Sequence, residues 1–316
     1  MTNDQVRIRP LLEDDLGEAD RIMRLAFGTF HELPDPGQFM GDADLVRTRW
    51  KASPSSAFAM DVGGQLAGSN FATRWGAFGF FGPLSLDPTF WNRGLASALI
   101  EPVIERLETW GVTKAGLFTH AESPTHLGLY QKFGFRPRAL TLLLDRSVDP
   151  GDRGSKDWVT YADLDRNQRS EALVDCRRLT DGIYPGLDVT SEIEAIQTQS
   201  LGDTVLITDG GLQGFAACHM GPGSEAGSGT CYIKFAAATQ GAGVRVRFRE
   251  LLEACGMYAA RQGAKRIVAG VNAARCEAYE EILSAGFHVS RTGVAMCRPN
   301  EPGFSRPGVY VIDDWR

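Results

Sequence analysis

The spacing of hydrophobic residues changes along the chain and predicts strands that alternate with helices. Runs typical of strands lie at Val6–Arg9, Ala57–Val62, Leu66–Arg74, Phe78–Leu86, Ala115–Thr119 and Arg138–Leu144. Apolar residues recur every three or four positions, as on one helix face, from Asp14 to Phe30, from Leu95 to Trp110 and up to Tyr130. Pro102 lies inside the second helix, where we expect a kink or a lost hydrogen bond. The first half is therefore expected to be an α/β unit.

The second half of the chain repeats this order of elements. Runs typical of strands lie at Val205–Thr208, Leu212–His219, Cys231–Ala238 and Arg266–Val271, and helices follow Gly243 and cover Arg275–Ser284. Gly63-Gly64 and Gly210-Gly211 predict a hairpin turn at the same place in each half. We interpret the chain as a duplicated α/β unit, with domains at residues 1–147 and 156–316. The polar stretch 145–157, interrupted by Gly and Pro, has the composition of a linker.

Composition and charge narrow the class of protein. The chain has 316 residues, of which 43% are hydrophobic and 23% charged, as in globular proteins. Its net charge of −6 argues against general nucleic-acid binding, which needs a basic surface. No apolar run is long enough to span a membrane, and the first residues lack the features of a signal peptide. We therefore expect a cytoplasmic protein without a nucleic-acid or membrane partner.

The cysteines give no sign of a metal site. All six lie in the second half, between Cys176 and Cys297. None forms a Cys-x-x-Cys pair, and no histidine lies beside them at the spacing of a metal ligand. We expect buried, reduced thiols and no bound metal.

One turn in the first half has the properties of an anion-binding site. Asn92-Arg93-Gly94-Leu95-Ala96 follows the third strand run and opens a helix. The first N–H groups of a helix have no partner within it, and small residues there let a phosphate approach the backbone. Arg93 adds a guanidinium that would hold such a phosphate. A plain turn between a strand and a helix is the alternative interpretation.

With a second motif, this turn resembles the Gcn5-related N-acetyltransferase (GNAT) superfamily. The superfamily's acetyl-CoA signature, Gln/Arg-x-x-Gly-x-Gly/Ala, reads Trp91-Asn92-Arg93-Gly94-Leu95-Ala96 here, with Trp91 in place of the polar residue. The second signature, Leu-Tyr-x-Lys-x-Gly-Phe, is matched in full by Leu129–Phe135. The opening Val6–Pro10 is also similar. The resemblance covers residues 6–144 well and residues 158–297 more faintly.

The resemblance implies a fold and a co-substrate. The fold is α/β, with two tandem GNAT-like units that are each a mixed, mostly antiparallel sheet flanked by helices, and the co-substrate is acetyl-CoA. In the first unit, the helix start would bind the pyrophosphate, and the preceding strand would bind the pantetheine arm through its edge N–H and C=O groups. The residues expected to bind acetyl-CoA are Leu84, Ser85, Leu86, Asn92, Arg93, Gly94, Leu95, Ala96 and Ser97.

The resemblance also implies catalytic roles. Tyr130 matches the tyrosine that protonates the departing thiolate in many members, although an aromatic residue that only packs is the alternative. His120 and Glu122 follow the end of a strand and are candidates, ahead of His126, for the base that removes the amine proton. A solvated strand end is the alternative interpretation of these two residues.

The expected reaction is transfer of an acetyl group to an amine in a ternary complex. Glu32 and Asp35 lie in the loop where the family holds its acceptor, and they would attract a cationic amine unless the loop is merely solvated. The acceptor is then a small-molecule or peptide amine, whose identity the sequence leaves open together with the oligomeric state. A non-catalytic acyl-CoA-binding regulatory or scaffold protein is the alternative.

The second half resembles a GNAT unit without a cofactor site. Its first signature reads Gln240-Gly-Ala-Gly-Val-Arg245, with a bulky arginine where the family has a small residue. Ile282 stands in the tyrosine position of its second signature. We expect this half to be structural and to shape the acceptor pocket. The strand-like segment 306–316 is expected to add an edge strand or to cover the pocket between the halves.

Overall fold

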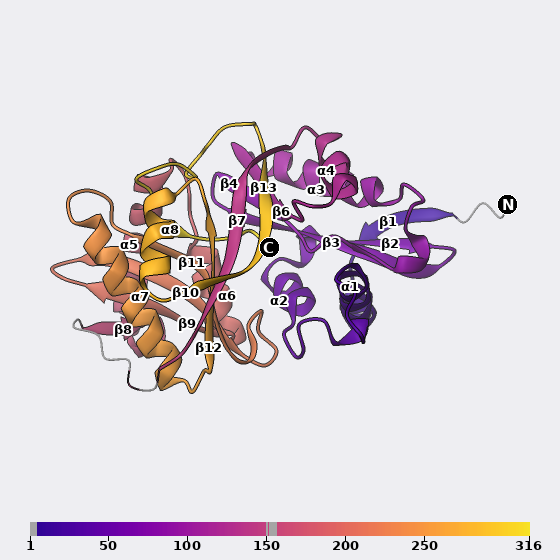
Figure 1. The fold of residues 1–316 in the computed structure, drawn as a ribbon. Helices are drawn as coiled ribbons and strands as arrows, with labels where there is room; N and C mark the ends of the chain where they lie inside the picture. The colour runs from indigo at the N-terminus through magenta and orange to yellow at the C-terminus, as the bar shows by residue number, and fades with distance from the viewer. Residues whose placement is uncertain (1–4, 150, 152–156) are drawn as a thin grey trace.

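The computed structural model describes residues 5–149, 151 and 157–316, so part of the predicted linker lies outside the described residues. Its strands form one mixed sheet (Figure 1), in the order β1-β2-β3-β4-β6-β13-β7-β12-β11-β10-β9-β8. Their bounds are β1 Val6–Pro10, β2 Ala57–Val62, β3 Gln65–Trp75, β4 Phe78–Phe81, β5 Ser85–Leu86, β6 Lys114–Thr119, β7 Arg136–Ser147, β8 Trp158–Thr160, β9 Gly202–Thr208, β10 Leu212–Gly221, β11 Gly227–Ala238, β12 Arg266–Asn272, β13 His288–Arg298 and β14 Val311–Ile312. Among the described strands, the β4–β6 and β11–β12 pairs are parallel and the others antiparallel, which confirms the expected mixed, mostly antiparallel sheet.

Each half contributes the same set of helices, which confirms the tandem arrangement. They are α1 Leu16–Phe30, α2 Leu45–Ala52, α3 Ala96–Thr109 and α4 Pro124–Gln131 in the first unit, and α5 Arg166–Ile183, α6 Thr190–Gln199, α7 Val244–Arg261 and α8 Cys276–Ser284 in the second. The apolar sides of α1 and α2 pack on β2 and β3, whereas α3 and α4 share a core with β6. In the second unit, α5 and α6 share a core with the first unit's Trp75, Phe78 and Phe80.

The two units exchange their last strands. β13 belongs to the second unit in sequence, but it lies antiparallel between β6 and β7 of the first unit, with Val294 opposite Thr119. β7 in turn pairs with β12 of the second unit, with Arg266 opposite Ser147. Figure 1 shows β7 and β13 side by side in the middle of the molecule. The sheet therefore continues across the domain division predicted at residues 147 and 156.

The structure corrects several expected elements. The run Phe78–Leu86 is two strands, because the chain bends at Gly82 and Pro83. α3 continues through Pro102, and β7 extends into the predicted linker because Arg146 pairs with Ile267. The hydrophobic pattern did not reveal α2, α5 or α6.

The 306–316 segment adds one short strand: β14 pairs on one side with β11, an interior strand of the sheet. One cysteine differs from expectation. Cys276 is exposed, whereas the other cysteines are buried free thiols.

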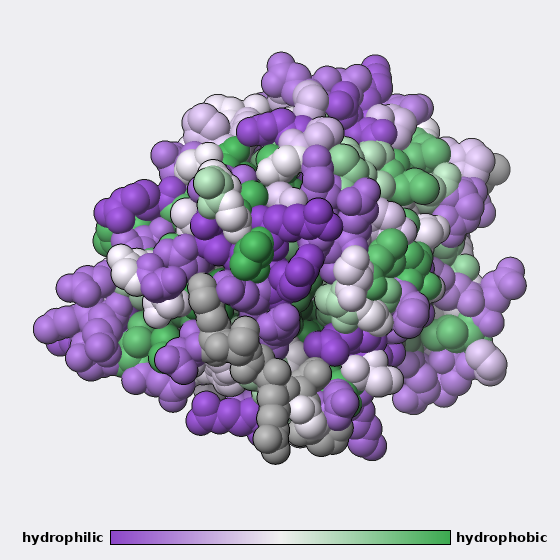
Figure 2. Space-filling model, turned by 60° about the vertical axis from the view of Figure 1, so that its left-hand side comes forward, coloured by the Kyte–Doolittle hydropathy of each residue, from purple (hydrophilic) through white to green (hydrophobic). Residues whose placement is uncertain are grey.

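The face of the molecule drawn in Figure 2 is predominantly polar. Figure 2 shows a face on which hydrophilic residues predominate and apolar residues gather in separate small patches. Within the described ranges, no helix is both long and apolar enough to cross a lipid bilayer.

Candidate active site

The strands that carry the expected pantetheine site diverge beyond Phe80. β4 pairs in parallel with β6 only from Phe78 to Phe80, opposite Lys114 to Gly116. Before and after the bend the chain pairs with β3, first through β4 and then through β5, with Ser85 opposite Ser69. β6, by contrast, continues beside β13. The edge of β5 that faces away from β3 is therefore not paired with β6.

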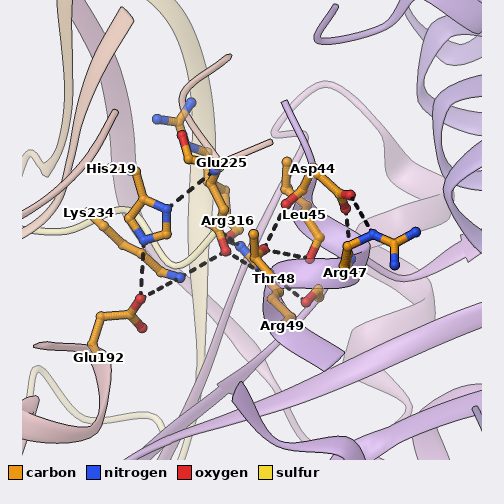
Figure 3. Close-up of polar contacts among 12 residues, drawn as sticks. Asp44, Leu45, Arg47, Thr48, Arg49, Glu192, His219, Glu225, Lys234 and Arg316 are labelled. Carbon is orange, nitrogen blue, oxygen red and sulfur yellow. Dashed lines mark hydrogen bonds and ion pairs between the residues drawn. The ribbon is translucent and has the colours of Figure 1, made fainter. Parts of the chain in front are cut away.

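The bend between β4 and β5 is fixed from both sides. The Gly82 N–H donates to the Phe71 carbonyl at 2.9 Å, and Arg49 Nη1 donates to the Gly82 carbonyl at 2.5 Å. The φ angle of Gly82 is 139°, in the range that favours glycine. Figure 3 shows Arg49 beside Glu225, a residue of the second unit. The position of this bend therefore depends on a contact between the units.

The start of α3 has the expected features of a phosphate site. Gly94 has a φ of 74°, and a Cβ built there would meet nothing within 4 Å. No described residue accepts a hydrogen bond from the N–H groups of Leu95, Ala96 or Ser97 in the structure. Because these groups lie at the positive end of the helix dipole, they are suited to an anion. Trp91, which departs from the signature, donates from Nε1 to the Leu86 carbonyl at 2.8 Å and so ties the loop to β5.

Tyr130 lies against the strand that ends at the bend. Its ring contacts Phe81, the last residue of β4, edge to face at 5.9 Å between ring centroids. Burial raises the pKa of the Tyr130 phenol far above its ordinary value of 10. The phenol therefore stays neutral, with its proton, at physiological pH.

A cluster of histidines lies where α1 ends, β6 ends and α4 begins. The His120 ring is 4.3 Å from Phe30, 5.0 Å from His31 and 5.6 Å from His126 between centroids. Burial lowers the pKa of all three histidines, and the neighbouring His31 and His126 lower that of His120 further, to about 4. The imidazoles are therefore neutral near pH 7 and able to accept a proton.

The predicted carboxylates lie at the surface. Glu122 Oε1 is 3.8 Å from His120 Nδ1, with the Glu122 side chain 66% exposed. The Asp35 carboxylate accepts from the Gly37 N–H at 3.1 Å and so caps a short 3₁₀ turn. Glu32 is exposed in the same loop. Thus Glu122 adjoins the histidine cluster, whereas Asp35 has a local structural partner.

Sequence reasoning missed two residues at this site. His31 directly follows Phe30 at the end of α1. These two adjacent aromatic rings were a signal that the sequence offered. Arg291 lies on β13 of the second unit, and its charge lowers the pKa of both His31 and His120. No local pattern shows that β13 is inserted into the first unit's sheet, so Arg291 had no signal.

In the second unit, ion pairs between α7 and α8 close the region that corresponds to the candidate site. Arg245 and Arg249 on α7 pair with Glu281 on α8, at 2.5 Å and 2.9 Å. Among the described residues, no hydrogen bond or ion pair joins α3 to α4 in this way. Ile282, in the tyrosine position, is fully buried in the core.

The comparisons with known proteins agree with this architecture. Residues 21–135 match the model of the acetyltransferase (GNAT) family. The chain is 30% identical over 132 residues to mycothiol acetyltransferase of Clavibacter sepedonicus, a match that covers 41% of this chain and 43% of that protein. The chain thus spans less than half the length of this relative.

Two solved structures share the fold over almost the whole chain. A putative acetyltransferase from Pyrococcus horikoshii has a TM-score of 0.70 at 16% identity and covers 98% of this chain and 95% of its own. A tandem GNAT protein from the clavulanic acid biosynthesis pathway has a TM-score of 0.60 at 13% identity, with 93% and 98% covered. With the family match and the repeated helices and strands, these likenesses lead to one conclusion: residues 21–135 form a GNAT family domain, and the chain as a whole has the tandem GNAT fold.

Proposed function

We propose that this protein is an acetyl-CoA-dependent N-acetyltransferase whose first unit transfers the acetyl group directly to an amine in a ternary complex. The observation that carries the proposal is the position of Tyr130. Its neutral, buried phenol lies against Phe81, immediately before the bend at which β5 leaves β6. A proton donor at this place is what departure of a thiolate requires. Family membership supports the same reaction class.

The residues of the first unit fit the parts of acetyl-CoA. The N–H groups of Leu95, Ala96 and Ser97 suit the pyrophosphate, with Asn92, Arg93 and Gly94 forming the turn before them. Leu84, Ser85 and Leu86 supply the strand edge for the amide-bearing pantetheine arm. When bound, the thioester supplies an acetyl group that is activated toward attack by an amine.

His120 is the first candidate for the base. Its neutral imidazole is in the form that accepts a proton, and the Glu122 carboxylate at 3.8 Å would stabilise the imidazolium that results. Tyr130 would hold the proton that the sulfur takes. Proton removal and proton donation are thereby assigned to two different elements, the end of β6 and α4.

The surface carboxylates favour a cationic acceptor. Glu32 and Glu122 are exposed near the histidine cluster, and each would attract a protonated amine before it loses its proton. Asp35 lies in the same loop but is already used as a cap. A small-molecule or peptide amine fits this arrangement.

Binding and turnover must be measured separately. Calorimetry with CoA should first show one site per chain, and release of CoA from acetyl-CoA should then be followed with a panel of amines, including diamines, amino acids and peptides. Acetylation of at least one amine, confirmed by mass spectrometry, is the expected result. Tight CoA binding without turnover of any amine would instead favour the acyl-CoA-binding regulatory protein. Absence of binding would contradict both.

A further inference from the structure

Two strands of the second unit, β11 and β12, also diverge. Here the space between them is occupied by another segment of the same chain, β14. β11 and β12 pair in parallel from Thr230 to Ile233, opposite Arg266 to Ala269. Beyond this point β14 pairs with β11, with Ile312 opposite Ala236 and Val311 opposite Ala237. The Ala238 N–H donates to the Tyr310 carbonyl at 3.4 Å. In the first unit, the corresponding edge is the one assigned above to the pantetheine arm.

The side chains of the segment around β14 alternate between the two faces of the sheet. Tyr310 and Ile312 belong to the core under α7 and α8, and the Tyr310 ring lies 5.4 Å from that of Phe248 on α7. Val311 and Trp315 belong to the core under α5 and α6. Trp315 also packs 4.8 Å from Phe78 of the first unit. The segment thus lies in the divergence as an extended chain and contributes side chains to the cores on both faces.

Buried hydrogen bonds and an ion pair hold the segment in place. Arg275, at the start of α8, donates to the Val311 carbonyl at 3.0 Å and pairs with Asp313 at 2.8 Å, with side chains 0% and 2% exposed. The Tyr232 hydroxyl donates to Asp314 at 3.0 Å. A Cβ at Gly270 would lie 2.3 Å from the Asp314 side chain, so only glycine leaves room there. The segment is therefore bound by specific polar and steric contacts, as a ligand is in its site.

We propose that residues 305–316 are an internal ligand of the second unit, filling the groove that would otherwise take the pantetheine arm of an acyl-CoA. A strand added to β11 and a pantetheine arm use the same edge, because both are extended chains whose amide groups bond to backbone N–H and C=O. The segment therefore keeps a latent acyl-CoA site closed, together with the Arg245 and Arg249 pairs to Glu281. The ligand class is taken from the proposed function, on which this inference rests.

The proposal is tested on the full chain by displacing the segment. Ile312→Asp places a carboxylate at a position that is fully buried and should release β14. The matched control is Val289→Asp, at a strand position that is 42% exposed. Hydrogen exchange at the Ala238 amide is the readout, with the amides of Val205 and Ile207 reporting whether the fold is retained. We expect Ala238 to exchange at least tenfold faster in Ile312→Asp and unchanged in the control.

Two probes then distinguish the occupants of the groove. A synthetic peptide with the sequence of residues 305–316, added to Ile312→Asp, should restore slow exchange at Ala238, and so should millimolar CoA. Neither probe should act on the unaltered protein at this amide. Protection by the peptide but not by CoA would overturn the acyl-CoA assignment. Unchanged exchange in Ile312→Asp, or protection by neither probe, would overturn the internal ligand.

Further measurements separate this inference from the proposed function. If CoA protects the Ala96 and Ser97 amides, the first unit binds it whatever happens at Ala238. If CoA protects neither region, the proposed function fails, and the peptide alone decides whether the segment is an internal ligand. Should Ile312→Asp lose protection at Val205 and Ile207 as well, Ile312→Ala takes its place. That smaller change is expected to speed exchange at Ala238 by a lesser factor, and unchanged exchange there would overturn the proposal.

Discussion

The guanidinium of Arg49, on α2 of the first unit, is paired with the carboxylate of Glu225 in the second unit by hydrogen bonds of 3.0 Å and 3.2 Å. Both side chains are buried, at 4% and 2% exposure. Lys234 bridges Glu225 to Glu192, and His219 Nε2 lies 3.3 Å from Glu192 (Figure 3). Because Arg49 also donates to the Gly82 carbonyl, this buried network connects the second unit to the bend at the candidate active site.

Breaking this pair should destabilise the whole molecule. Arg49→Met leaves Glu225 buried with fewer partners, and we expect the free energy of unfolding to fall by about 3–5 kcal/mol. Arg47→Met is the matched control, because Arg47 lies on the same helix and forms a partly exposed ion pair with Asp44, the residue that caps its start. The control should change the free energy by less than about 1 kcal/mol. Urea unfolding measures both, and equal effects of the two variants would contradict the assigned role of Arg49.

The same network should make the free energy of unfolding depend on pH. Burial alone would raise the pKa of Glu192 and Glu225, but for Glu192 the charge of Lys234 and the contact with His219 together outweigh burial and lower the pKa to about 2. Arg49 and Lys234 hold the pKa of Glu225 well below its ordinary value. A lowered folded-state pKa contributes stability that is present above the unfolded pKa and is lost as the pH falls through the folded pKa.

The free energy of unfolding should therefore decrease as the pH is lowered from about 5 to about 2. Glu192→Gln removes one of the titrating groups, so its curve should be flatter over this interval although its stability at pH 7 is lower. Chemical unfolding at a series of pH values gives both curves. Parallel curves for the variant and the unaltered protein would show that Glu192 does not titrate as stated.

CoA binding should depend on Gly94. Gly94→Asp places a carboxylate at the start of α3, where it would repel phosphates, and should weaken CoA binding at least tenfold. The control is Gly111→Asp at the other end of α3, about 25 Å away at 1.5 Å per residue. Gly111 has a φ of 64°, close to the 74° of Gly94, so both variants carry a similar backbone strain. Calorimetry should show weaker binding only for Gly94→Asp, and an unchanged affinity would mean that phosphates bind elsewhere.

Tyr130 should affect turnover more than binding. Tyr130→Phe keeps the ring against Phe81 but removes the proton donor, and kcat should fall by roughly 10- to 10,000-fold. Tyr279→Phe, on α8 of the second unit, is the matched control and should leave kcat unchanged. The dissociation constant of CoA should stay the same in both variants. If kcat is unaffected where chemistry limits the rate, the Tyr130 phenol only packs.

Some features followed from the sequence because they depend on neighbouring residues. The hairpins at Gly63-Gly64 and Gly210-Gly211, the helix that follows Gly94 and the tandem arrangement are local patterns or their repetition. The bend at Gly82 could not be predicted, because a continuous apolar run indicates a single strand even where the pairing with a neighbouring strand ends within it. The insertion of β13, the path of β14 and the place of Arg291 depend on contacts between distant segments, which periodicity does not record. Of the predicted site residues, Tyr130 and His120 lie near the divergence of β5 and β6, whereas their chemical roles stay predictions.

The exchanged strands make the first unit dependent on the second. A fragment of residues 1–150 lacks β13, so β6 and β7 lose the strand that lies between them. The N–H and C=O groups on two strand edges would then be unpaired, which is unfavourable and favours association with other chains. Val294 and Met296 of β13 also pack with Leu117, Tyr130 and Phe135, so the core that holds Tyr130 would be uncovered.

We therefore expect the fragment 1–150 to be aggregated or unfolded and not to bind CoA, although it contains every predicted residue of the cofactor site. Adding residues 157–316 as a separate chain should restore CoA binding, because this second chain supplies β13 to the position between β6 and β7. Size-exclusion chromatography and calorimetry check both statements. A monomeric 1–150 fragment with the CoA affinity of the whole chain would show that β13 is dispensable. Restoration of binding by the second chain in trans would instead show that the two units function as one sheet, in which the second supplies a strand to the site of the first.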